Sequence, residues 1–244
     1  MFTDQHWSKF ETIFRNFRID LKQNLRNFIE AILYRIRTAC PWRDLPAAFG
    51  KLNSIFKKFS PWSKDNKWLK IFKLISSNAD LEWVFIDAHH VKAEQHATAI
   101  KDQAISKSMG GSSSKIHLVI DSHGNPADFL IEDGTIHDVK VAPKLVDSLD
   151  LNETEILCAD TGYDSESLRA QIEKTSTQAN ITKKSNTLLN NDQMDWYLYK
   201  IRHLVENAFA RLKHFRGIAT RYDKLKQSYE NSVALAWSFI WLPL

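Results

Sequence analysis

The spacing of apolar residues changes near residue 80, and this change constrains the fold more than any other feature of the sequence. Residues 3–77 carry apolar side chains three or four positions apart, a pattern typical of amphipathic helices. Four such stripes follow one another between short turns, and Thr3 is placed to cap the first helix. From Glu82 the apolar residues form short runs that favour β-strands. We therefore expect a helical region over residues 1–80 and a second domain over residues 81–244.

The second part of the chain alternates predicted strands and helices. A hairpin turn around His123-Gly124 joins two of the strands. Hairpin strands followed by alternating helices and strands predict a mixed α/β sheet. The strands are expected at 83–86, 115–120, 128–131, 155–159 and 179–182, and the helices at 139–149, 165–173, 195–215 and 233–241.

Formal charge is distributed unevenly along the chain. Residues 1–80 contain 15 Lys and Arg against 7 Asp and Glu, whereas residues 81–160 contain 6 against 14. Residues 161–244 contain 12 against 8. A basic first third beside an acidic middle indicates that one part holds a polyanion and the other holds cations. Charged faces that are simply solvated would give the same pattern.

The cysteine content and the hydropathy pattern indicate a cytoplasmic protein. The chain has two cysteines, too few for a disulfide framework. No secretory signal opens the sequence. The longest apolar run, 232–244, is shorter than the roughly 20 residues that a bilayer span needs. We expect neither a membrane protein nor a secreted one.

Two aspartates follow apolar runs that predict buried strands. Asp87 follows residues 83–86, and Asp160 follows residues 155–159. Ligands of α/β sheets bind at the carboxyl ends of strands, so two carboxylates there can converge. A carboxylate beside so much apolar surface is costly unless a cation compensates it. Each aspartate could also serve only as a turn former at the end of its strand.

The predicted helix over 195–215 places Tyr199, Arg202, Glu206 and Lys213 on one face. At about 100° per residue these four positions fall within an arc of about 60°. The apolar stripe of the helix is centred elsewhere, so Glu206 lies at the margin between core and water. Arg202 and Glu206 are four residues apart and could also form a simple surface ion pair.

The spacing Tyr199-x2-Arg202-x3-Glu206-x6-Lys213 resembles the Y-R-E-K signature of bacterial insertion-sequence DDE transposases, in the insertion-sequence-five group. The resemblance extends in the family's order from about residue 3 to the end of the chain. Its further motifs are Pro41-Trp42-Arg43-Asp44-Leu45-Pro46, Gly110-Gly111, Ser114-Lys115-Ile116-His117, Ala159-Asp160-Thr161-Gly162-Tyr163-Asp164 and Ile218-Ala219-Thr220-Arg221-Tyr222. The pair His137-Asp138 also resembles a recurrent family pair, without a role that its residues define.

This resemblance implies a ribonuclease-H-like mixed sheet flanked by helices, with an all-helical, helix-turn-helix-like DNA-binding region over 1–80 and the catalytic domain over 81–244. It implies a catalytic and metal-binding triad of Asp87, Asp160 and Glu206. Three ionised carboxylates cannot share a small site unless divalent cations neutralise them. Their oxygen ligands select Mg²⁺, with Mn²⁺ as a substitute, and two ions would serve the reaction.

The resemblance also implies a transposase that binds the terminal inverted repeats of its insertion sequence. Such an enzyme hydrolyses the phosphodiester at the element ends and joins the 3′-hydroxyl to target DNA by transesterification. Pairing two element ends implies a homodimer or larger assembly on DNA, and a bacterial, nucleoid-associated location. The residues expected to contact DNA are Tyr199, Arg202 and Lys213, with Arg211, Lys115 and Arg43 as further candidates.

Two other functions stay open. A zinc-dependent hydrolase could use Asp87, His89, His137 and Asp160, although no tight histidine pair supports it. A DNA-binding protein that has lost transposition is the other, and the intact triad argues against it.

Two loops complete the sequence predictions. Residues 110–115 lack the order of a phosphate-binding loop and are expected to form a flexible loop. A loop is also expected at 184–194, where the preceding residues 181–184 lack a proline that relatives often carry.

Overall fold

The computed structural model describes residues 3–21, 24–184 and 191–242. The chain forms two compact units: the first combines Met1–Ile75, Glu94–Ile100 and Leu212–Leu244, and the second combines Ser76–Ala93 and Lys101–Arg211. The C-terminal segment thus belongs to the same unit as the N-terminal helices. The functional division at residue 80 stays a prediction. Within the predicted loop at 184–194, residues 185–190 lie outside the described residues.

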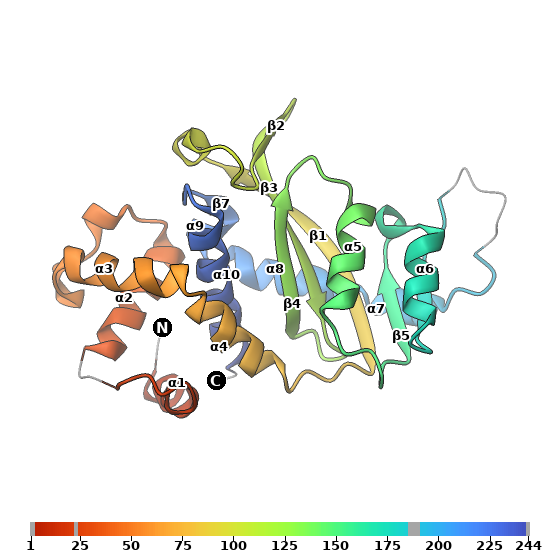
Figure 1. The fold of residues 1–244 in the computed structure, drawn as a ribbon, viewed down its shortest axis with the longest axis horizontal. Helices are drawn as coiled ribbons and strands as arrows, with labels where there is room; N and C mark the ends of the chain where they lie inside the picture. The colour runs from red at the N-terminus through yellow and green to blue at the C-terminus, as the bar shows by residue number, and fades with distance from the viewer. Residues whose placement is uncertain (1–2, 22–23, 185–190, 243–244) are drawn as a thin grey trace. The chain divides into compact units, whose positions relative to one another are not determined.

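The first unit is helical, as the periodicity of residues 3–77 predicts. Thr3 caps its first helix, because its hydroxyl oxygen accepts a hydrogen bond from the His6 N–H at 3.2 Å. The helices are α1 (Asp4–Asn16), α2 (Leu25–Thr38), α3 (Leu52–Lys64), α4 (Lys67–Ser76), α9 (Arg216–Ala219) and α10 (Lys226–Trp241), with short 3₁₀ turns at Trp42–Asp44, Ala47–Phe49 and Gln95–Ala99 and the two-residue strand β7 (Thr220–Arg221) (Figure 1).

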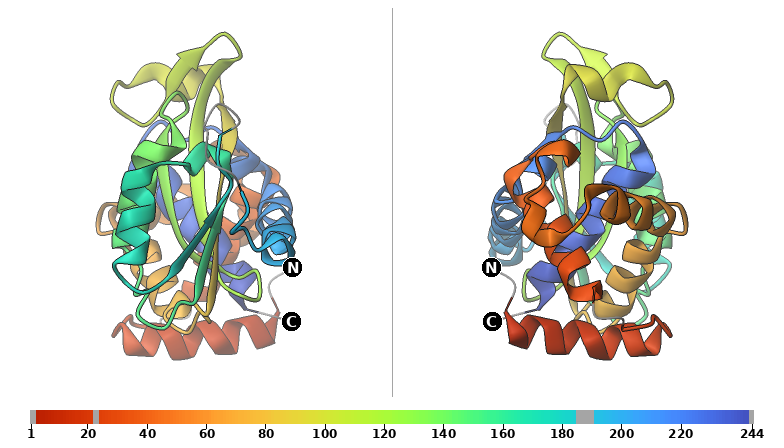
Figure 2. Two further views of the ribbon diagram at one scale, coloured as in Figure 1. Left: turned by 90° about the vertical axis from the view of Figure 1, so that its right-hand side faces the viewer. Right: turned by 90° about the vertical axis from the view of Figure 1, so that its left-hand side faces the viewer.

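Helix α10 lies in the core of the first unit and contacts α2 and α3 (Figure 2). Its buried Asn231 makes polar contacts with the residues at the junction of α3 and α4. The Asn231 carboxamide accepts a hydrogen bond from the Trp68 N–H at 3.2 Å and donates to the Ser63 carbonyl at 3.2 Å. These bonds fix the turn between α3 and α4 against α10. No helix among the described residues is long and apolar enough to cross a membrane.

The second unit is built on a mixed sheet. Strands β1, β5 and β6 are parallel, and β3 runs antiparallel to both β1 and β4. The resulting order is β4-β3-β1-β5-β6, which is the ribonuclease-H-like arrangement. The strands are β1 (Trp83–Ala93), β2 (Ser106–Ser108), β3 (Gly111–Ile120), β4 (Pro126–Asp133), β5 (Ile156–Ala159) and β6 (Gln178–Ile181).

Helices cover the sheet of the second unit on both faces (Figures 1 and 2). Helices α5 (Asp138–Asp147) and α6 (Glu166–Glu173) cover one face over an apolar core. Helix α7 (Trp196–Ile201) and the start of α8 (His203–Lys213) lie against the other face. There the His89 ring of β1 lies 5.3 Å from the Phe209 ring of α8. Alternate residues of β1 and β5 therefore face two different environments.

Three sequence predictions for this unit were wrong. Strand β1 does not end at residue 86, because its pairing with β3 continues to Lys92. Residues 111–115 belong to β3, which the two-residue turn Met109-Gly110 joins to the unpredicted strand β2, so they are not a flexible loop. The predicted helix at 195–215 breaks at Arg202. The Arg202 N–H bonds to the Tyr199 carbonyl and the Val205 N–H to the Arg202 carbonyl, a tighter three-residue spacing.

We predict that His117 on β3 makes the protein sensitive to acid. Its buried ring lies 3.2 Å from the Tyr163 hydroxyl, and burial, with the charges of Lys115 and His90, lowers its pKa from 6.5 to about 4 although Asp138 opposes this. Between these pH values the unfolded chain binds a proton that the folded chain does not. The free energy of unfolding should therefore fall by about 1 kcal/mol per pH unit from pH 6.5 down to about 4.

Urea denaturation at several pH values tests this, with His117→Gln expected to flatten the slope. His214→Gln, at an exposed position, is the control. An equally steep slope in His117→Gln would show that another group is responsible.

Candidate active site

Two aspartates stand side by side where β5 ends. Strands β1 and β5 pair in parallel as far as Ile86 and Ala159, so the next residues in register are Asp87 and Asp160. Strand β1 continues past this point along β3, where Asp87 lies opposite Leu118. The prediction that these two strands bring both carboxylates to one edge is confirmed.

Asp87 is a desolvated carboxylate with two donors. Its Oδ2 accepts a hydrogen bond from Arg202 Nη1 at 2.5 Å, and its Oδ1 accepts one from the Ala88 N–H at 2.7 Å. Burial raises the pKa of Asp87, the neighbouring Asp160 raises it further, and the bonds from Ala88 and Arg202 oppose that rise. The Asp87 carboxylate therefore sits where negative charge is costly and where positive charge is favoured.

Asp160 fixes the turn that follows β5. Its Oδ1 accepts a hydrogen bond from the Gly162 N–H at 2.8 Å and so caps the short helix Thr161–Tyr163. A Cβ at Gly162 would lie 3.0 Å from Asp160 Oδ1 and 3.0 Å from Asp138 Oδ2. The carboxylates of Asp138 and Asp160 thus approach the same glycine from two sides. A side chain there would displace at least one of them.

Asp138 begins α5 and is paired with Lys115. The Lys115 ammonium group lies 2.9 Å from Asp138 Oδ1 and 3.3 Å from the Ile136 carbonyl oxygen. Only 8% of Lys115 is exposed, because it lies on the interior strand β3. This placement argues against the predicted DNA contact for Lys115. The role of Asp138 was not predicted from the sequence. The one signal was the family-like dipeptide His137-Asp138.

Arg202 reaches Asp87, and the Tyr199 ring lies beside its guanidinium. The Arg202 guanidinium lies 5.5 Å from the centre of the Tyr199 ring, on the same side of the sheet as Asp87. The start of α7 is fixed to β6, because Asn180 accepts a hydrogen bond from the Asp195 N–H at 3.0 Å and donates to its carbonyl at 2.9 Å. Burial lowers the pKa of Arg202, but Asp87, Tyr199 and Asp160 more than offset this and raise it overall.

The other residues predicted on this face do not join the two aspartates. Glu206 is exposed in the first turn of α8, and Lys213 is exposed at the end of that helix. Arg211 donates a hydrogen bond to the Gly124 carbonyl at 2.6 Å. Because the helix breaks at Arg202, the four signature residues are not on one continuous helical face. Within the described part of the chain, no three Asp, Glu, His or Cys side chains are close enough to hold one metal ion.

The remaining predicted residues lie apart from this pair. His137 is exposed at the start of α5, whereas the His89 ring packs against Phe209, so the proposed zinc ligands are not assembled among the described residues. Arg43 is exposed in the 3₁₀ turn of the first unit. Its neighbour Trp42 lies under the Arg35 guanidinium, 4.3 Å away, which gives this family-like turn a structural role.

Comparison with known proteins identifies the class to which this fold and site belong. Residues 79–241 match the family model of the transposase DDE domain, about two thirds of the chain. The chain therefore belongs to the DDE transposases of bacterial insertion sequences, enzymes that cleave and transfer DNA strands. Residues 2–72 match a second model, described as "Putative transposase of IS4/5 family".

Two curated relatives come from insertion sequences. A "Putative transposase for insertion sequence element IS6501" of Brucella ovis is 34% identical over 128 residues, covering 52% of this chain and 97% of that protein. A "Putative transposase for insertion sequence element IS402" of Burkholderia cepacia is 28% identical over 120 residues, covering 46% of this chain and 54% of that one. Among solved structures, a piggyBac transposase synaptic complex with hairpin DNA has a TM-score of 0.41 and 12% identity, over 68% of this chain and 42% of that chain.

We predict that Asp160→Asn stabilises the protein in buffer containing EDTA. The substitution removes the negative charge beside Asp87, while the amide oxygen can still accept the hydrogen bond from Gly162. The free energy of unfolding should rise by about 1 kcal/mol. Urea denaturation measures it. Asp160→Ala is the companion variant, because it removes the cap as well and should gain less. If the Asp160→Asn variant is no more stable than the wild type, the carboxylates of Asp87 and Asp160 do not repel each other.

Proposed function

We propose that this chain binds the terminal inverted repeats of its own insertion sequence, hydrolyses the phosphodiester at the element ends and joins the 3′-hydroxyl to target DNA. The observation that carries the proposal is the adjacent pair Asp87 and Asp160, with Asp87 desolvated and bonded to the Arg202 guanidinium, in a chain of the DDE family. Phosphoryl transfer needs positive charge around the reacting phosphate. Carboxylates can supply this charge indirectly, because they hold cations at the site.

The donor set fits a divalent cation. Asp87 and Asp160 offer hard carboxylate oxygens at adjacent strand positions, and Mg²⁺ or Mn²⁺ prefers such ligands. We propose Glu206 as the third ligand on the Y-R-E-K spacing of the family; it lies in the first turn of α8, shortly after Arg202, which reaches Asp87. Two such ions, when bound, would polarise the phosphate and stabilise charge on the attacking and leaving oxygens.

Arg202 has two partners in this proposal. Its guanidinium forms an ion pair with Asp87. Its planar fork is also suited to bind two phosphate oxygens at once, so on DNA it would hold the phosphate next to the cut site. The Tyr199 ring, whose centre lies 5.5 Å from the guanidinium, would help to hold Arg202 in place through a cation–π contact. Lys115 and Asp138 keep the turn at Gly162, and with it Asp160, in place.

Lys213, Arg211 and Arg43 are proposed as further contacts to DNA phosphates. Lys213 and Arg43 are both exposed, and Arg211 is exposed although it bonds to the Gly124 carbonyl. The basic residues of the N-terminal region would supply most of the remaining phosphate contacts. Because two element ends must be paired, we propose a homodimer or larger assembly on DNA, acting at the bacterial nucleoid.

Cleavage of a labelled duplex that carries the element's own end tests the catalytic proposal. We expect nicking at the element boundary with Mg²⁺ and none with EDTA. Glu206→Gln should lower the rate by about a hundredfold or more, because a positioned carboxylate is lost while the side chain keeps its size. Glu173→Gln, an exposed position on α6, is the matched control and should cut at the wild-type rate.

Two results would contradict the catalytic proposal. If the protein binds the duplex but cuts under no divalent metal, it is a DNA-binding relic. If cutting survives Glu206→Gln and requires zinc, the histidine site is the active one instead.

A further inference from the structure

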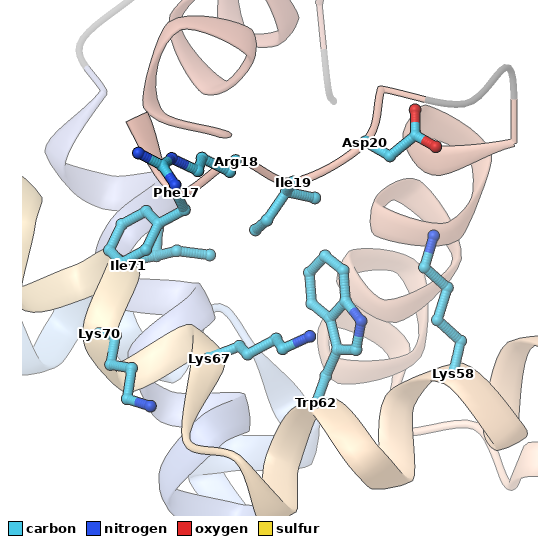
Figure 3. Close-up of a pocket in the computed structure, with 9 residues that line it drawn as sticks. All are labelled: Phe17, Arg18, Ile19, Asp20, Lys58, Trp62, Lys67, Lys70 and Ile71. Atoms are coloured by element: carbon cyan, nitrogen blue, oxygen red, sulfur yellow. The ribbon is translucent and has the colours of Figure 1, made fainter. Parts of the chain in front are cut away.

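A cavity of about 490 Å³ lies within the first unit, far along the sequence from the aspartate pair (Figure 3). Its walls are the segment 17–20 that follows α1, one side of α3 and one side of α4. Trp62 of α3 forms an apolar wall and is 7% exposed. Nothing in the proposed catalytic reaction uses this cavity.

Cations predominate among the polar side chains around the cavity. Arg18, Lys58, Lys67 and Lys70 line it, with Asp20 as the one carboxylate among its lining residues. The ammonium groups of Lys58 and Lys67 lie 5.3 Å and 5.2 Å from the Trp62 ring centre. Figure 3 shows Lys67 directed toward the indole, whereas Lys58 extends past the indole on the side of Asp20. The cavity therefore combines an apolar wall with several positive charges, a combination that favours an anionic occupant.

Arg18 occupies a backbone position that normally selects glycine. Its φ is 53°, in the left-handed region, directly after the end of α1. The Ile19 N–H bonds to the Phe14 carbonyl at 2.9 Å and the Arg18 N–H to the Arg15 carbonyl at 3.0 Å. These two bonds define a Schellman motif, whose left-handed residue is usually glycine. An arginine there costs conformational free energy, because a residue with a Cβ is less stable than glycine in the left-handed region.

We propose that this cavity binds the phosphate backbone of DNA and anchors the first unit on the duplex. Its lining has donors that suit phosphate oxygens, and the described lining residues include no asparagine or glutamine, the side chains that read adenine edges. The excess of 15 basic over 7 acidic residues in 1–80 extends the positive field around it. The inference rests on the proposed action on DNA, but not on the proposed catalytic residues.

Fluorescence anisotropy with a labelled duplex of random sequence, in EDTA and over a series of salt concentrations, tests the cavity. The double variant Lys67→Gln with Lys70→Gln should bind about tenfold more weakly at moderate salt. The slope of log affinity against log salt should also fall by about two, since each lost phosphate contact removes about 0.9. The matched control is Lys140→Gln with Lys174→Gln, two exposed lysines of the second unit that lie outside the basic N-terminal region. It should change the slope much less.

The Arg18→Gly variant separates an effect on DNA binding from an effect on folding stability. Glycine relieves the left-handed strain, so the thermal unfolding midpoint should rise. The loss of the guanidinium should weaken DNA binding about threefold at the same time. A purely structural role for Arg18 would not move stability and affinity in opposite directions.

The outcomes distinguish this inference from the proposed function. If the wild-type protein binds no duplex, the proposed action on DNA fails together with the cavity. If it binds and the cavity variant matches the control variant, the cavity inference is overturned while the proposed function stands. If inorganic phosphate competes at the cavity but the variants bind DNA like wild type, the cavity is a small-anion site and the DNA anchor is likewise overturned.

Discussion

The structure depends on how charge is compensated at the end of the parallel strands. The pairing of β1 with β5 leaves Asp87 and Asp160 in adjacent positions, and burial makes ionised Asp87 costly. Two carboxylates in this setting require positive charge from another group. Arg202 supplies it at 2.5 Å, and the α7 segment that carries Arg202 is fixed by Asn180. The ion pair of Arg202 with Asp87 therefore links the position of α7 to the electrostatics of the two aspartates.

Local pattern predicted most of the fold. Residues 3–77 gave helices because apolar side chains recur at helical spacing, and the strands at 83 and 156 followed from short apolar runs. The parallel pairing of these two strands brings Asp87 and Asp160 together at one edge, as expected of an α/β sheet. What local pattern could not show is β2, whose three polar residues form a strand only because β3 supplies a partner.

The active-site geometry was harder to predict because it depends on a backbone break. A continuous helix over 195–215 would place Arg202 and Glu206 on one face, but the tighter turn at Arg202 directs its guanidinium to Asp87 and leaves Glu206 exposed. The position of Lys115 was also hard to predict. Sequence alone cannot distinguish a surface lysine from one that is 8% exposed and paired with Asp138. The family-like residue Arg221 is also buried, which indicates packing within its unit rather than binding.

Binding of Mn²⁺ by the protein alone, followed by the paramagnetic signal of the free ion, tests the central claim most directly. If Asp87 and Asp160 form a cation site that Arg202 fills in the absence of metal, Asp160→Asn should weaken Mn²⁺ binding about tenfold or more. Arg202→Gln should strengthen it, because the competing guanidinium is gone. Asp150→Asn, an exposed aspartate of the same unit, should bind like wild type. Unchanged Mn²⁺ affinity in both Asp160→Asn and Arg202→Gln would contradict the account.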